Sequence, residues 1–265
     1  MSAADGVGAG AERRGGSMTI GLISDVHANV IALEAALEAL KRRRVDTILC
    51  LGDLVGYGPA PNEAIDLIRS EGIECTLGAS DERLAFGFIS ASKKRHGVAD
   101  EILSWTRGVL EPSHLAFLQG LPVQKRIQTP AGWLRFFHGT VDNTSERLNL
   151  NQDPHSLTRM LERHRCSILA SGATHVPFFR RVGPNGLVVN PGSVGLSLNG
   201  EPGADYALLT VSEDSVEIEM DKVEYDFAAV AFEIVAWGIS PMVAEAVQMG
   251  RLPEKLAGGM GDGPA

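Results

Sequence analysis

Two side chains near the start of the chain have the types and the spacing of metal ligands. Asp25 and His27 directly follow the apolar segment Thr19–Ile23 and are separated by one residue. In an extended chain, side chains two residues apart point to the same side, so both could reach one ion. A capping aspartate beside a hydrogen-bonded histidine would produce the same pattern, and the pair alone does not distinguish the two interpretations.

Three further candidates also follow strand-like segments. Asp53 lies in a glycine-rich segment after an apolar run, His138 follows Trp133–Phe137, and His175 follows Ser167–Ala170. Open α/β sheets bind ligands at the carboxyl ends of their strands, so we expect these side chains to meet. An Asx turn would explain Asp53 alone, and structural hydrogen bonds would explain either histidine. Together the candidates favour a metal site, and mixed oxygen and nitrogen ligands suit Mn, Fe, Zn or Ni.

The elements that must position these residues alternate between strand and helix patterns. Apolar strand segments are predicted at Thr19–Ile23, Asp46–Leu51 and Ile73–Leu77, and helical spacing at Val30–Arg43 and Asn62–Arg69. Such alternation predicts a parallel sheet with crossover helices. The segment Asp81–Gln119 predicts several short helices, one of them starting at Pro112.

Short strand candidates dominate the rest of the chain and predict a second sheet packed on the first. They are Val123–Gln128, Trp133–Phe137, Ser167–Ala170, Phe178–Val182, Leu187–Val189, Tyr206–Val211 and Val216–Met220. A closing helix is predicted over Phe227–Trp237. We therefore predict a single domain over residues 18–250, a disordered tail over residues 1–17 and a flexible tail over residues 251–265.

Several segments, in this order, resemble the calcineurin-like metallophosphoesterases, in particular their bacterial single-domain branch. They are Ile23–Asn29, Cys50–Pro59 with Asn62 and Glu63, Phe137–Gly139, Gly172–Pro177 and Asn190–Gly195. The resemblance implies an α/β fold, namely a four-layer α/β/β/α sandwich of two mixed β-sheets flanked by helices. It also implies a two-metal site, with Asp25, His27 and His175 on the first metal, Asp53 bridging, and His138 on the second.

Three positions depart from the family pattern. After the third strand the family has Gly-Asn-His-Asp or Gly-Asn-His-Glu, whereas this chain has Ala79 in place of the ligating asparagine and Ser80 in place of the catalytic histidine. Ala173 replaces a metal-binding histidine. Both lost ligands belong to the second metal, so we expect one tightly bound divalent transition metal and a second that is weak or absent. Water, substrate, Asp81 or Asp142 could complete a weak second site.

Two functions are compatible with this pattern. The first is a metal-dependent phosphoesterase that hydrolyses a small phosphomonoester or phosphodiester with metal-activated water, its activity weakened by the three departures. The second is a catalytically degenerate relative that binds one metal and a phosphate ligand or protein partner without turnover. The complete first-metal set favours the enzyme.

Composition restricts the compartment and the partners. The 265 residues include 33 acidic and 24 basic side chains, a net charge of -9, which argues against a protein that coats nucleic acid or binds a membrane through basic residues. Three cysteines without paired spacing predict neither a disulfide framework nor a cysteine zinc site and indicate the reducing cytoplasm. No signal peptide or membrane span is predicted, and no sequence feature specifies an oligomeric state.

Overall fold

The computed structural model describes residues 16–87, 97–148, 151–183 and 186–253, so the two predicted tails lie almost entirely outside the described residues. The strands are β1 (Met18–Ile23), β2 (Thr47–Cys50), β3 (Glu74–Cys75), β4 (Gln124–Thr129), β5 (Gly132–Phe137), β6 (Ile168–Ser171), β7 (Phe178–Val182), β8 (Gly186–Asn190), β9 (Ala204–Val211) and β10 (Val216–Val223). The helices are α1 (Val30–Arg42), α2 (Pro61–Ser70), α3 (Ala79–Phe86), α4 (Val98–Val109), α5 (Pro112–Gln119), α6 (Pro154–His164), α7 (Phe227–Ala236) and α8 (Pro241–Met249).

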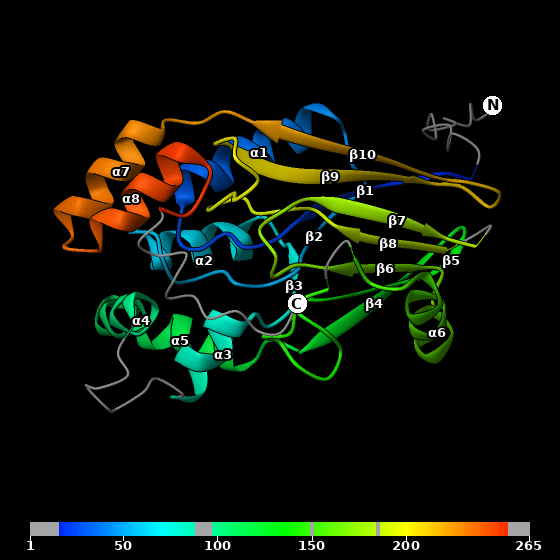
Figure 1. Cartoon of the computed structure of the whole chain (residues 1–265), viewed down its shortest axis with the longest axis horizontal. Helices are drawn as coiled ribbons and strands as arrows, with labels where there is room; N and C mark the ends of the chain where they lie inside the picture. Colours follow the sequence, from blue (N-terminus) through cyan, green and yellow to red (C-terminus); the bar gives the residue numbers. More distant parts are fainter. Residues whose placement is uncertain (1–15, 88–96, 149–150, 184–185, 254–265) are drawn as a thin grey trace, which may run out of the picture.

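Two five-stranded mixed sheets lie face to face (Figure 1). The first has the order β10-β9-β1-β2-β3, in which β1, β2 and β3 are parallel and β9 is antiparallel to both of its neighbours. The second has the order β4-β5-β6-β8-β7, with β5, β6 and β8 parallel and an antiparallel strand at each edge. The parallel strands bring the loops that follow β1, β2, β5 and β6 to one end of the molecule.

Alternation along the strands builds separate apolar layers. In β1, Ile20 and Leu22 point between the two sheets, where they pack with Phe136 of β5. Ile23 faces the other way and packs under α1 and α2. On the far face of the second sheet, apolar side chains of α6 pack on Leu169. The predicted four-layer α/β/β/α sandwich is therefore confirmed.

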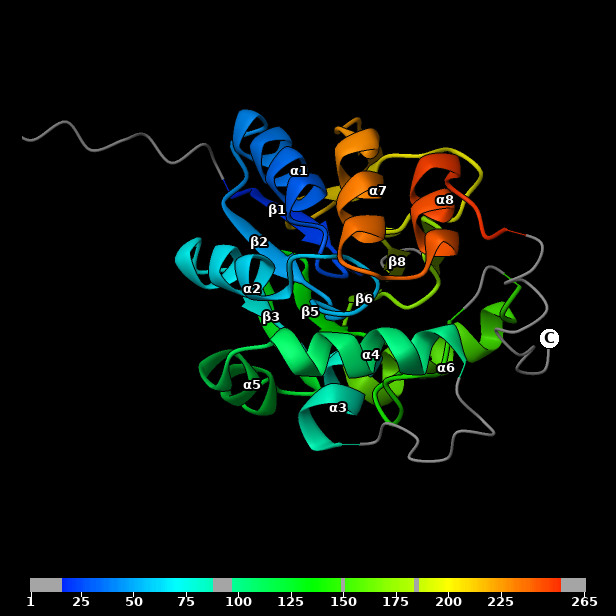
Figure 2. The same ribbon diagram turned by 90° about the vertical axis from the view of Figure 1, so that its left-hand side faces the viewer.

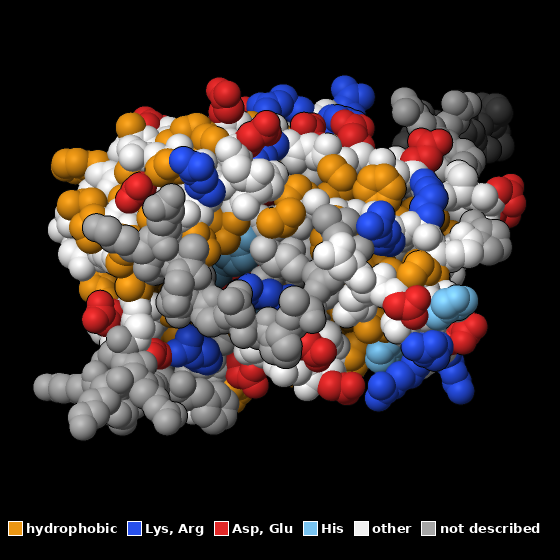
Figure 3. All heavy atoms as spheres, viewed as in Figure 1, with side chains coloured by type: hydrophobic (Ala, Val, Ile, Leu, Met, Phe, Trp, Pro, Cys, Tyr) orange, Lys and Arg blue, Asp and Glu red, His pale blue; other side chains and the backbone are white. Residues whose placement is uncertain are grey.

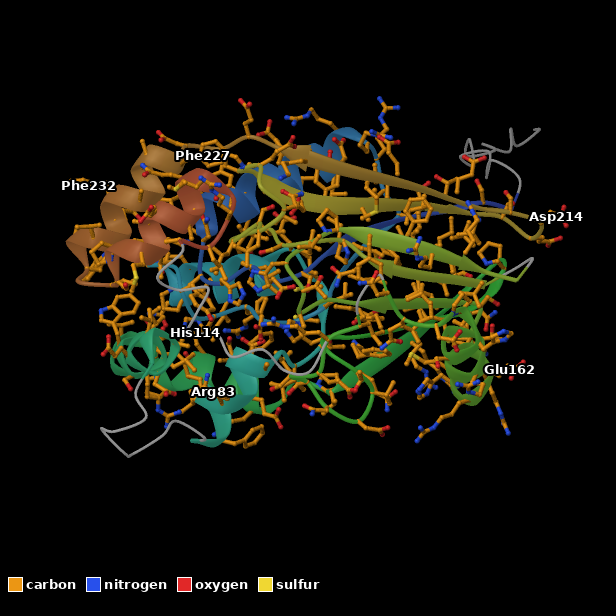
Figure 4. All side chains as sticks on the ribbon, in the orientation of Figure 1. Arg83, His114, Glu162, Asp214, Phe227 and Phe232 are labelled. Atoms are coloured by element: carbon orange, nitrogen blue, oxygen red, sulfur yellow. The ribbon has the colours of Figure 1, made fainter. Side chains whose placement is uncertain are left out.

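The remaining helices lie around the end of the sandwich where the parallel strands finish (Figure 2). Helices α7 and α8 pack on each other and on Ile102 of α4. Phe232 lies on the outer side of α7 with 74% of its surface exposed (Figure 4). Within the described residues, no helix has both the length and the apolar character needed to cross a bilayer.

The structure corrects three expectations about the second half of the chain. Strands β9 and β10 belong to the first sheet, because β9 pairs with β1 in the register Ile20↔Leu209. Helix α6 was not predicted, since most of its residues are polar and only Leu157 and Leu161 of its side chains are buried. The chain also forms a helix after Phe227–Trp237, namely α8, which starts with a proline at its first turn and ends before Gly250.

Candidate metal centre

All five predicted candidates converge at the end of the sandwich where the parallel strands finish. Asp25 and His27 follow β1, Asp53 follows β2, His138 follows β5 and His175 lies beyond β6, so both sheets contribute. Each is buried, with between 0% and 9% of its surface exposed. In Figure 3 a histidine surface lies in a hollow near the middle of the visible face, beside basic side chains.

One group of ligand atoms consists of Asp25, His27 and His175. The Nε2 atom of His175 lies 3.1 Å from the Oδ1 atom of Asp25 and 3.1 Å from the Nε2 atom of His27. The Nε2 atom of His27 lies 3.7 Å from the same Asp25 oxygen. Ligands bound to one ion at about 2.0 to 2.2 Å lie about 3 to 3.5 Å apart, so the group is close to the size that an ion requires.

A second group consists of Asp25, Asp53 and His138. The Nε2 atom of His138 lies 3.4 Å from the Oδ2 atom of Asp53 and 3.8 Å from the Oδ1 atom of Asp25. The two groups therefore share Asp25, whereas the resemblance places Asp53 between the metals. The Oδ2 atom of Asp53 also lies 3.8 Å from the Nε2 atom of His27, which leaves the expected bridging role of Asp53 as a prediction.

The Nδ1 atom of each histidine, the ring nitrogen that faces away from the carboxylates, lies against a backbone carbonyl oxygen. The Nδ1 atoms of His27, His138 and His175 lie 3.3, 3.1 and 2.7 Å from the carbonyl oxygens of Val55, Leu51 and Leu196, respectively. Because a carbonyl only accepts, each Nδ1 must donate a proton. A neutral ring then has its lone pair on Nε2, directed at the carboxylates, which is the tautomer that binds a metal.

The backbone around these residues is held in an unusual conformation. Asp25, His27, Asp53 and His175 have φ between 48° and 58°, in the left-handed region that costs energy for residues other than glycine. The surrounding fold must compensate for this strain. The segment Asn190–Gly195 supports one of these loops, since the Ser193 hydroxyl and the Gly195 amide both donate to the Asp25 carbonyl.

A cation fits the donor set for electrostatic reasons as well. The Oδ1 atom of Asp25 is buried and has no hydrogen-bond partner, which costs free energy unless a positive charge lies nearby. Burial opposes ionisation of this carboxyl, but His175 and His138 outweigh it and hold its pKa well below the usual value. At His138 burial is likewise outweighed, by Asp53 and Asp25, which raise its pKa to about 10. The cluster thus favours positive charge between fixed carboxylates.

The N-terminus of α3 encloses Asp53. The backbone amide of Ser80 donates to its Oδ1 atom at 2.8 Å, and the Ser80 hydroxyl donates to its Oδ2 atom at 3.1 Å. Gly78 is required here, because a Cβ atom at this position would lie 2.1 Å from the Oδ1 atom. Sequence reasoning identified Ser80 only as a replacement and did not predict these two hydrogen bonds.

The two acidic residues considered for completing a second site have other roles. Asp81 is buried and accepts hydrogen bonds from the backbone amides of Leu54, Val55 and Gly78 at 3.0 to 3.2 Å, so it supports the loop that carries Asp53. Burial and Asp53 raise the pKa of Asp81 to about 7. Asp142 is exposed and lies 3.5 Å from Arg163 of α6.

Tyr57 is a neighbour of the centre that sequence reasoning did not assign. Its ring meets the ring of His27 edge-on, with centroids 4.8 Å apart. Burial and the charge of Asp53 raise its pKa to about 12, so its hydroxyl stays protonated at neutral pH. The sequence signal that could have identified Tyr57 is its position between two glycines, Gly56 and Gly58.

Comparisons with known proteins agree with the fold, and the residues that the family model matches include all five residues of the centre. The model of the calcineurin-like phosphoesterase superfamily domain matches residues 18–214. An uncharacterized protein of Methanocaldococcus jannaschii is 28% identical over 251 residues, which cover 88% of this chain and 98% of that protein. A solved metallophosphoesterase from Sphaerobacter thermophilus is 28% identical, with a TM-score of 0.71 over 88% of this chain and 99% of that one. A hypothetical protein from Pyrococcus horikoshii, 19% identical, shares the fold with a TM-score of 0.78 over 89% of this chain and 100% of that one.

Proposed function

The chain belongs to the calcineurin-like phosphoesterase superfamily, and from the centre that it builds on this fold we propose that it is a metal-dependent phosphoesterase with one tightly bound ion. The residues that would hold this ion are Asp25, His27, Asp53 and His175, and His138 would belong to an impaired second site. The ion would be Mn, Fe, Zn or Ni, in keeping with mixed oxygen and nitrogen ligands.

The observation that carries the proposal is the direction of the histidine nitrogens. Three rings have their Nδ1 atoms fixed by backbone carbonyls and turn their Nε2 atoms toward the unpartnered Oδ1 atom of Asp25, at 3.1 to 3.8 Å. In the neutral tautomer that these carbonyls favour, no ring donates a hydrogen bond to this oxygen, which then needs a cation as its partner. Histidine lone pairs and a carboxylate oxygen that converge on one position are typical of a metal centre.

A bound divalent cation would supply Lewis acidity, activating water and withdrawing charge from a phosphoryl group. The chain's own residues then determine which esters can react. The Ser80 hydroxyl stands where the family has a histidine that protonates the leaving group. Here the hydroxyl donates a hydrogen bond to Asp53 instead. Missing acid catalysis costs about 10²- to 10⁴-fold for leaving groups that need a proton. We therefore expect small phosphomonoesters or phosphodiesters with good leaving groups, such as phenolates, to react fastest.

The same proposal includes a cytoplasmic location and a small phosphate ester as the partner. The three cysteines are free thiols, two of them buried, in keeping with a reducing compartment. The net charge of -9 is unsuited to coating nucleic acid.

Turnover of a chromogenic phosphodiester, bis(p-nitrophenyl) phosphate, tests the proposal. Hydrolysis should require added Mn²⁺, stop with a chelator and fall at least about 10²-fold in Asp25→Ala and His175→Ala variants. His155→Ala, which alters an exposed histidine of α6, is the matched control and should retain wild-type activity.

The degenerate relative that binds without turnover is the second candidate, and the observation that favours it is the loss of side-chain ligands at Ala79 and Ala173. It would be supported by a protein that binds Mn²⁺ tightly but turns over neither the diester nor p-nitrophenyl phosphate. A protein that binds no divalent cation would contradict both candidates.

A further inference from the structure

The Oδ2 atom of Asp53 is the oxygen that a second cation would have to use. Its Oδ1 atom is enclosed by the start of α3, where it accepts the Ser80 amide at 2.8 Å and is in close contact with Gly78. Only Oδ2 faces the histidines, 3.4 Å from the Nε2 atom of His138 and 3.8 Å from that of His27. Any ion shared between Asp53 and His138 must therefore bind at this oxygen.

The Ser80 hydroxyl already uses part of the same oxygen. It lies 3.1 Å from Oδ2 and, since a carboxylate only accepts, it donates its proton there. A carboxylate oxygen has about two lone-pair positions, so a hydroxyl proton on one of them leaves room for one cation. Because the acceptor is charged, this hydrogen bond is stronger than a neutral one.

We propose that Ser80 is a positioning residue that keeps the centre mononuclear, because its hydroxyl occupies the lone pair of Asp53 that a second divalent cation would need. The inference rests on the proposed metal-binding function. It explains more than the missing ligands do, since Ala79 and Ala173 merely fail to bind a second ion, whereas Ser80 competes with it.

The test is Mn²⁺ binding by the full-length protein, stripped of metal and titrated in equilibrium dialysis, with electron paramagnetic resonance to detect coupled Mn²⁺ pairs. The variants are Ser80→Ala and Ser80→Gly, which remove the hydroxyl, and Ser80→Thr, which keeps it. Ser212→Ala, in the turn between β9 and β10, is a serine-to-alanine control remote from the centre. First-site affinity and circular dichroism establish that each variant is folded.

We expect Ser80→Ala and Ser80→Gly to bind a second Mn²⁺ about tenfold more tightly than the wild type and to give a coupled-pair signal. Ser80→Thr and Ser212→Ala should match the wild type. Unchanged second-site affinity in both hydroxyl-free variants would overturn the inference while leaving the first site intact. Weaker second-site binding would also overturn it, since Ser80 would then be a ligand. A wild type that binds no Mn²⁺ would overturn the proposed function together with the inference.

Discussion

The Nε2 atoms of His27 and His175 lie 3.1 Å apart inside the protein, although the Nδ1 atom of each ring already faces a backbone carbonyl. Two lone pairs directed at each other at this distance repel unless a proton or a cation lies between them. Asp25, whose Oδ1 atom is 3.1 Å from the Nε2 atom of His175, adds negative charge. Proton uptake and metal binding therefore compete for one position in the molecule.

Metal binding should release protons. Burial lowers the pKa of His138, but Asp53 and Asp25 outweigh it and raise the pKa to about 10, so the metal-free chain carries a proton there at pH 8. A cation bound at Asp25 and Asp53 would offset the charges that hold this proton, so apparent Mn²⁺ affinity should rise with pH, by up to about tenfold per pH unit between pH 7 and 9. Calorimetry in two buffers with different ionisation enthalpies measures the release directly. Affinity independent of pH over this range would contradict the prediction.

The raised pKa of His138 also determines how the stability of the metal-free protein depends on pH. The folded pKa of His138, about 10, exceeds the ordinary value of 6.5, so protonated His138 stabilises the folded state fully below about pH 6.5. This contribution should be lost as the pH rises from 6.5 toward 10. Urea unfolding of metal-free protein at pH 6.5 and 9.5 should show lower stability at the higher pH. His138→Gln should show a smaller difference between the two.

Asp81→Ala should destabilise the fold. The substitution leaves the buried amides of Leu54, Val55 and Gly78 without their acceptor. Because burial and Asp53 raise the pKa of Asp81 to about 7, the change also removes the cost of a buried charge. We expect a net loss of about 2 kcal/mol in the free energy of unfolding, measured with urea.

Asp142→Ala is the control for this measurement, since it removes an exposed carboxylate paired with Arg163. Its effect should stay within about 0.5 kcal/mol. Equal stabilities of the two variants would show that Asp81 does not support the loop that carries Asp53.

The second site should be recoverable by substitution. Ala79 is the first residue of α3, and Ala173 has a φ of 69°, a conformation that histidine tolerates better than most residues. Because the Ser80 hydroxyl competes for Asp53, the rebuilt variant combines Ala79→Asn and Ala173→His with Ser80→Ala. It would give the second ion four protein ligands, and diester turnover should rise at least about 10²-fold. Replacing Ser80 by histidine instead of alanine should help mainly poor leaving groups. A rebuilt variant that binds a second ion without faster turnover would favour the binding function.

The cysteines should be irrelevant to catalysis. Cys50 and Cys75 are neighbours in β2 and β3, both are free, and burial raises the pKa of the Cys75 thiol well above its usual value. Burial also raises the pKa of the half-exposed Cys166 to about 11. Iodoacetamide treatment of the folded protein at pH 7.5 should therefore leave Mn²⁺ binding and turnover unchanged. Loss of either without unfolding would contradict this assignment.

The sequence predicted the convergence of the centre because its residues stand at the ends of parallel strands, which share one edge. It did not predict which atoms meet. The hydrogen bonds from Ser80 to Asp53 depend on how α3 approaches β2, a tertiary contact without a local signal. The sheet to which β9 belongs was misassigned for a similar reason, since strand order depends on long-range pairing. Helix α6 was missed because most of its residues are polar, although Leu157 and Leu161 recur at the helical spacing.

The number of tightly bound ions per chain tests the metal centre most directly. Protein stripped with a chelator, saturated with Mn²⁺ and passed through a desalting column should retain one ion per chain by elemental analysis. The Asp25→Ala variant should retain none, and His155→Ala should retain one. Two equally retained ions about 3.5 to 4 Å apart, the usual spacing of two-metal hydrolases, would contradict a mononuclear centre, and a wild type that retains no ion would contradict a tight metal centre altogether.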